Sequence, residues 1–133
     1  MAVEDQRYRE AARAIQTIRD EVRWKSKKDV DHLAKRKSLG HLSQDATVGD
    51  YNGVIGHLVS QPDHRVYLYV YGKDRYYGVR GAWHGAEWLA LFSSNGIMET
   101  AFPPAAMDDY LDARGFVELG TLREVMSWII ENG

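Results

Sequence analysis

The chain has 133 residues, of which 44% are hydrophobic, and its 17 Lys and Arg stand against 19 Asp and Glu. This length and composition predict one compact domain, residues 1–133, and exclude a disordered segment, a collagen-like repeat and a coiled-coil rod. The absence of cysteine excludes disulfides, thiol catalysis and zinc-thiolate sites. No apolar run reaches the roughly 20 residues of a membrane helix. The first ten residues lack the apolar centre of a Sec signal, so we expect a cytoplasmic protein or one delivered by a non-Sec route.

The net charge of −2 is the sum of two unequal parts. Residues 1–40 carry 11 basic and 7 acidic side chains, a net of +4, whereas residues 41–133 carry 6 and 12, a net of −6. The basic excess is densest over residues 23–37. This cluster is either a solvated face or a local anion-binding surface, so the negative total does not exclude a phosphate-bearing partner.

The first half of the chain has the apolar spacing of helices. Apolar residues at three- and four-residue steps predict a helix over about residues 4–25. A second short helix or a turn is expected over residues 29–39. A third is expected over about residues 48–60, and Thr47 and Asp50 have the spacing of a capping box at its start.

After residue 65 the pattern changes to that of strands. Four segments rich in Val, Tyr, Trp and Phe are separated by turn residues, and Asn95-Gly96 is the strongest hairpin signal. Loops this short join antiparallel neighbours, so we predict a four-stranded antiparallel β-meander. The tail, residues 105–133, is expected to be helical in two pieces around Gly115. N-terminal helices, a meander and C-terminal helices make an α+β domain. The predicted strands are residues 66–71, 76–83, 88–92 and 97–102.

Three residues of the second predicted helix could act on a phosphate. His32, Lys35 and Arg36 are three and four positions apart, so a helix places them on one face. An imidazole moves a proton near neutral pH, and adjacent cations stabilise negative charge on phosphorus oxygens. The competing interpretation is a surface histidine in a basic helix.

Thr100 is a candidate from the last predicted strand. The two-residue period of a strand places its hydroxyl on one face with Met98 and Phe102, inside an apolar row. Threonine is also a common strand residue, which is the simpler interpretation.

The remaining polar candidates are weaker. Arg80 could bind a phosphate, or pair with Glu87 or Glu99. The other histidines form no His-x-His or His-x-x-x-His pair, and we predict neither a metal site nor a cofactor. They are His41, His57, His64 and His84.

Tyr67, Tyr69 and Tyr71 alternate with Val and Leu in the first predicted strand, so both faces of that strand are apolar. The tyrosine face is further core, a partner surface or a platform on which bases stack.

Several of these segments occur in an order typical of one nuclease superfamily. His32-Leu33-Ala34-Lys35-Arg36 precedes Thr47-x-x-Asp50-Tyr51 at a helix start, and the meander closes on Asn95-Gly96-Ile97-Met98-Glu99-Thr100-Ala101-Phe102-Pro103. In this order, residues 28–104 resemble the barnase–EndoU–colicin–RelE-like nuclease superfamily, particularly members from phages, mobile elements and polymorphic toxins. Residues 105–133 lie outside the usual core of that superfamily.

The resemblance implies metal-independent endoribonuclease activity, in which the 2′-hydroxyl attacks the adjacent phosphorus and leaves a 2′,3′-cyclic phosphate. His32 would transfer the proton, Lys35 would stabilise the phosphorane, and Thr100 would hydrogen-bond the phosphate. The implied partners are RNA, tRNA included, and a cognate inhibitor protein. Arg36 and Arg80 would be secondary phosphate contacts, and the second proton-transfer group would be His84 or Tyr77.

A different interpretation is a non-catalytic protein–protein interaction module, such as an immunity-type or phage accessory protein. The acidic late segment and the tyrosine-rich strand favour it. It predicts an exposed aromatic patch of several hundred Å², which could be the face of a homodimer.

Overall fold

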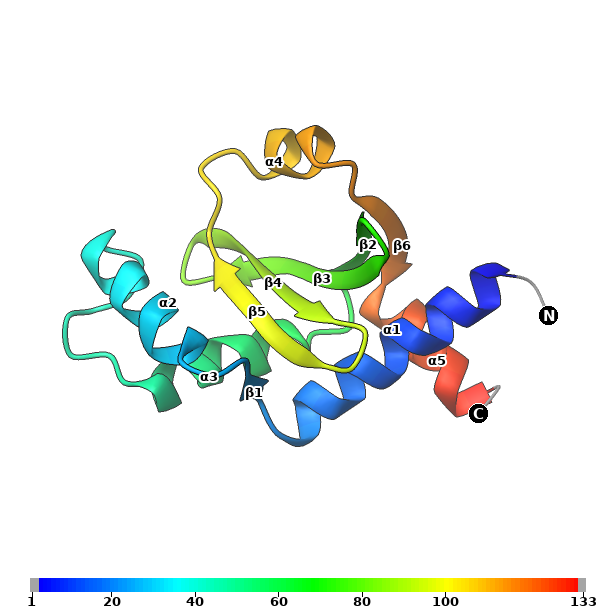
Figure 1. The fold of residues 1–133 in the computed structure, drawn as a ribbon, viewed down its shortest axis with the longest axis horizontal. Coiled ribbons are helices and arrows are strands. Elements are labelled where there is room, and N and C mark those ends of the chain that lie inside the picture. The colour runs from blue at the N-terminus through cyan, green and yellow to red at the C-terminus, as the bar shows by residue number, and fades with distance from the viewer. Residues whose placement is uncertain (1–2, 132–133) are drawn as a thin grey trace.

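The computed structural model describes residues 3–131. They fold into an α+β domain (Figure 1). In chain order its elements are α1 (Val3–Asp20), β1 (Arg23–Trp24), α2 (Lys28–Ser38), α3 (Val48–Leu58), β2 (Arg65–Tyr71), β3 (Asp74–Trp83), β4 (Ala86–Ser93), β5 (Ile97–Phe102), α4 (Met107–Ala113), β6 (Val117–Thr121) and α5 (Leu122–Glu131).

The strands form one mixed sheet in the order β1-β5-β4-β3-β2-β6. The predicted meander is its centre, with β2 to β5 paired antiparallel in sequence. The prediction of only four strands is wrong, because β1 pairs parallel with β5 and β6 pairs antiparallel with β2. The added strands have two and five residues, too few to show a clear alternating pattern.

The helices cover the two faces unequally, as Figure 1 shows. The main core joins α1, α3 and α5 to one face of the sheet, with Ile15, Ile55 and Leu122 fully buried. On the other face α4 buries Met107 and Leu111 against the sheet. The remaining helix, α2, lies against β5 at the edge of the sheet.

The segment after Pro104 is therefore part of the fold. It was expected to be two helices, but the structure shows a helix, a strand and a helix. Tyr8 of α1 stacks on Trp128 of α5 at 5.2 Å between ring centroids. One contact of the tail with the N-terminal helix is therefore an aromatic stack.

A bulge in β5 changes which side chains share a face. Leu91 pairs with Thr100 and Phe92 with Met98, so Glu99 has no partner across the ladder. Met98 is fully buried in the main core, and Thr100 is only partly buried. The prediction that Met98 and Thr100 share a face is wrong, because a bulge inserts one residue into the two-residue period.

The predicted helix boundaries hold for α2 and α3, and both bonds of the Thr47–Asp50 capping box are present. The first helix ends at Asp20, before the predicted Lys25, and Trp24 joins the sheet. Across residues 3–131 no helix has both the length and the apolar character needed to cross a bilayer. Met1 and Ala2, part of the segment in which no Sec signal is expected, lie outside the described residues.

Candidate functional site

The candidate site begins on α2, where His32 is half-buried among cations. Lys28, Lys35 and Arg36 lie four positions before, three after and four after it on the same helix, so they share its face. Burial first, and then the charges of these three side chains, lower the pKa of His32. The imidazole is therefore neutral at pH 7 and can accept a proton.

His32 meets Thr100 across the gap between α2 and β5. The distance from His32 Nδ1 to Thr100 Oγ1 is 3.3 Å, so two residues 68 positions apart in sequence form one polar pair. The sequence placed both in a candidate site, and the structure brings them together.

Tyr51 of α3 continues this contact into the core. Its hydroxyl donates to the carbonyl oxygen of Ala101 at 2.5 Å, and accepts from the amide of Ala101 at 3.3 Å. Burial raises the pKa of Tyr51, and hydrogen bonds from the Ala101 backbone and the Thr100 side chain act in the opposite direction. Tyr51 therefore stays protonated and donates its hydrogen to Ala101.

The Thr100 contact is made by Nδ1 of His32 and leaves Nε2 free of it. In the tautomer whose Nδ1 carries the hydrogen and donates to Thr100, the lone pair of the neutral ring lies on Nε2. In the sequence, Tyr51 is only part of the Thr47-x-x-Asp50-Tyr51 motif at a helix start, and nothing in the spacing distinguishes a core tyrosine from one beside a site.

Trp24 forms one wall of the site. Its ring lies 6.0 Å from that of His32 and 5.2 Å from that of Tyr51. Its indole nitrogen donates to Asn52 Oδ1 at 2.8 Å, which fixes the ring. Sequence reasoning missed Trp24 because it was placed at the end of the first helix.

Arg36 is buried without a partner of opposite charge. Its side chain is 4% exposed, its Nε has no hydrogen-bond partner, and its guanidinium lies 5.6 Å from the centre of the Phe102 ring. No carboxylate within residues 3–131 forms an ion pair with it. Since burying an unpaired cation is costly, this side chain favours an anion at the site.

Three predicted site residues lie elsewhere. Tyr77 is fully buried in the main core, where its hydroxyl donates to Glu10 at 2.6 Å. Arg80 pairs with Glu87 at 2.9 Å and with Asp108 at 2.7 Å. His84 is exposed in the turn between β3 and β4 and stacks on Trp83. None of these contacts involves His32, because strand spacing predicts a face but not which helix covers it.

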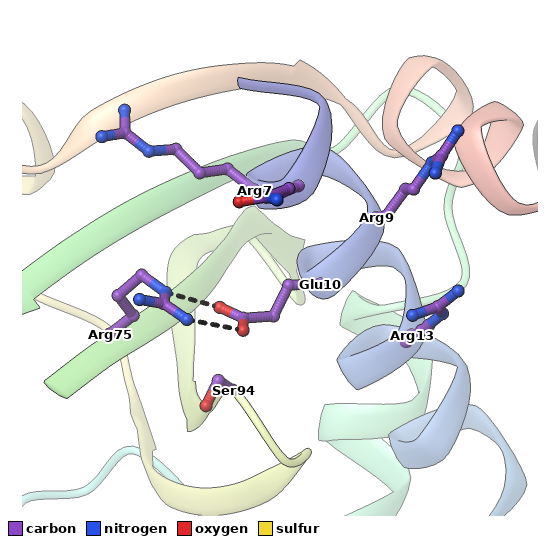
Figure 2. Close-up of a pocket in the computed structure, with 7 residues that line it drawn as sticks. Arg7, Arg9, Glu10, Arg13, Arg75 and Ser94 are labelled. Carbon is purple, nitrogen blue, oxygen red and sulfur yellow. Dashed lines mark hydrogen bonds and ion pairs between the residues drawn. The ribbon is translucent and has the colours of Figure 1, made fainter. Parts of the chain in front are cut away.

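A cavity of about 510 Å³ beside α1 is a poorer candidate, although four arginines line it. Figure 2 shows the Glu10 carboxylate inside it, bound by Arg75 at 2.7 and 2.8 Å, while Arg7 and Arg13 point away from that pair. The hydrogen bonds from Arg75 lower the pKa of Glu10, so this carboxylate is ionised. It neutralises Arg75, so that guanidinium is not free for an anion, and the pair ties α1 to β3.

Within residues 3–131, no group of three or more His, Asp or Glu side chains is placed to hold a metal ion. No protein-family model matches the chain, and neither a curated protein nor a solved structure is significantly similar to it.

Proposed function

We propose that this protein is a metal-independent endoribonuclease whose site is formed by His32, Thr100 and Lys35. The observation that carries the proposal is the pairing of His32 with Thr100 beside the cations of α2. A neutral imidazole that can accept a proton and cations that can stabilise a charged phosphorane are what cleavage of a phosphodiester by its own 2′-hydroxyl requires. A toxin or phage-associated effector is the biological setting that the superfamily resemblance suggests.

The reaction follows from the orientation of His32. Its Nε2 accepts the proton of the 2′-hydroxyl as the 2′-oxygen forms a bond to phosphorus. Lys35 stabilises the negative charge on the non-bridging oxygens, and Arg36, one residue further along α2, is a secondary phosphate contact. The bond from phosphorus to the 5′-oxygen then breaks, and water supplies the proton to that leaving oxygen because Tyr77 and His84 lie elsewhere. Thr100 and Tyr51 hold the imidazole rather than the phosphate.

The test is incubation of the protein with RNA in EDTA, followed by analysis of the new ends. We expect 2′,3′-cyclic phosphate ends, and the His32→Ala variant should cleave at least about 100-fold more slowly, since a general base contributes that much. His57→Ala is the control, because His57 is an exposed histidine on α3. Absence of cleavage, or equal cleavage by His32→Ala, contradicts the proposal.

A second candidate function is the protein–protein interaction module. Tyr67 is buried and Tyr69 packs on Phe116 at 4.7 Å, so they are not free for a partner. Tyr71, Val70 and Val117 remain 68%, 55% and 55% exposed, and β2 pairs with β6. A homodimer or an inhibitor protein would bury this apolar edge. Light scattering of Tyr71→Ser against the unchanged protein tests it, because loss of a dimer in the variant alone supports the module.

A further inference from the structure

A groove of about 580 Å³ continues from the candidate site between α2 and α4. Arg36 is one helical turn beyond His32, and Phe102 is two strand residues beyond Thr100, steps of about 6 and 7 Å. The groove therefore begins about one nucleotide away from the imidazole. Three cations line it against one carboxylate, Asp109; the cations are Lys35, Arg36 and Arg114.

One wall of the groove is a preformed stack. The guanidinium of Arg114 lies 3.8 Å from the centre of the Tyr110 ring. Tyr110 is held in turn by Phe102 at 5.1 Å and Phe116 at 6.1 Å between centroids. Arg114 is exposed, so the outer plane of its guanidinium is open to a flat ligand. Nucleobases stack on arginine planes of this kind.

The opposite wall has the buried Arg36, whose Nε lacks a partner and whose side chain faces the groove. A cation beside a flat stacking surface suits one unit of a nucleic acid, its phosphate and its base. A base in a duplex has no free face in this position, so the strand must be unpaired.

We propose that this groove binds an unpaired nucleotide next to the cleaved bond, with Arg36 at its phosphate and the Arg114–Tyr110 stack under its base. This inference rests on the proposed function for the identity of the polymer, and it names single-stranded RNA as the substrate class. It also assigns a role to α4, which lies outside residues 28–104.

The experiment measures binding of a 12-residue 2′-fluoro RNA, which lacks the attacking hydroxyl, by fluorescence anisotropy. The single strand should bind the unchanged protein at least about tenfold more tightly than the same strand in a duplex, and Arg114→Ala should lose about tenfold. Arg114→Lys should lose nearly as much, because it keeps the charge but not the plane. The control is Arg123→Ala on α5, which should bind unchanged.

Three outcomes overturn the inference: equal binding of strand and duplex, unchanged binding by Arg114→Lys, or an equal loss in the Arg123→Ala control. Each concerns binding of an RNA that cannot be cleaved. Failure of the cleavage assay with selective binding intact would instead contradict the proposed reaction and leave the groove assignment standing.

Discussion

The charge around His32 comes from neighbours on its own helix, and one of them can be removed without touching the proposed phosphate contacts. Lys28 is exposed on the first turn of α2, and after burial its charge has the largest effect on the pKa of His32. Lys28→Gln should raise the pKa of His32, because it removes a cation that opposes protonation.

Nuclear magnetic resonance titration of the His32 ring in both proteins gives this pKa directly. The acid limb of the cleavage profile should move to higher pH in Lys28→Gln, since His32 must be neutral to act as a base. Because the folded pKa of His32 is lowered, its contribution to stability is complete above the ordinary histidine pKa and is lost as pH falls. An unchanged His32 titration in Lys28→Gln would show that the helix charges do not control this ring.

A second prediction concerns the hydroxyl of Tyr51. Tyr51→Phe leaves both the amide and the carbonyl of Ala101 without their side-chain partner in a buried position. We expect a loss of about 1–3 kcal/mol in the free energy of unfolding, measured in urea. Tyr71→Phe is the matched control, because its hydroxyl is on a residue that is 68% exposed. A loss of similar size in both variants would contradict the role of the Tyr51 hydroxyl.

At the scale of elements, the turn between β4 and β5 packs directly on α1. Gly96 has φ of +77°, and a Cβ there would lie 2.9 Å from the carbonyl oxygen of Ala14 and 2.9 Å from Thr17 Cβ. Gly85 has a similar φ of +81° with nothing within 4 Å. Gly96→Ala should therefore lower the unfolding temperature more than Gly85→Ala does. Because both glycines have a positive φ, the difference between the two variants reports the clash with α1 rather than the backbone strain. An equal loss of stability in both variants would mean that α1 shifts to make room for the methyl group at position 96.

Local chemistry was enough to predict much of the element pattern. The Thr47–Asp50 capping box and the Asn95-Gly96 turn are encoded by neighbouring residues, and both occur as predicted. The bulge at Glu99 was not visible, because the residue types of the strand do not mark it; in the structure Glu99 pairs with Lys25 at 2.8 Å. The short strands β1 and β6 form by pairing with the longer strands β5 and β2.

The candidate site could likewise be predicted only in part. Helical spacing placed His32, Lys35 and Arg36 on one face, and Thr100 was nominated from the last predicted strand. Tyr77 and Arg80 could not be judged from spacing, because their contacts with Glu10 and Asp108 depend on how distant helices pack. The stack of Arg114 on Tyr110 joins residues four apart on a short helix, and it gains significance only from the groove that it lines.

For the whole molecule, the uneven charge has a structural explanation. Glu118 and Asp108 of the acidic tail pair with Arg65 and Arg80 of the sheet, at 2.7 Å each. Within residues 3–131, only Lys25 and Arg23 of the basic cluster form ion pairs, the latter with Glu21. The acidic tail therefore leaves most of the cations of α2 uncompensated. A net charge of −2 coexists with a positive site because the opposite charges are neutralised on different surfaces.

The last prediction concerns the union of the tail with the core. Leu122 of α5 is fully buried among residues of the main core, which also contains Tyr51. Leu122→Ala should cost about 2–5 kcal/mol in the free energy of unfolding. Because Tyr51 supports the His32–Thr100 pair through that same core, urea should unfold the tail and the site together. In Leu122→Ala, the urea midpoint measured by circular dichroism and the midpoint measured from the His32 resonance should fall by the same amount. In the control Arg123→Ala, at an exposed position, both midpoints should stay unchanged. A drop in one midpoint alone would mean that α5 and the site belong to separate cooperative units.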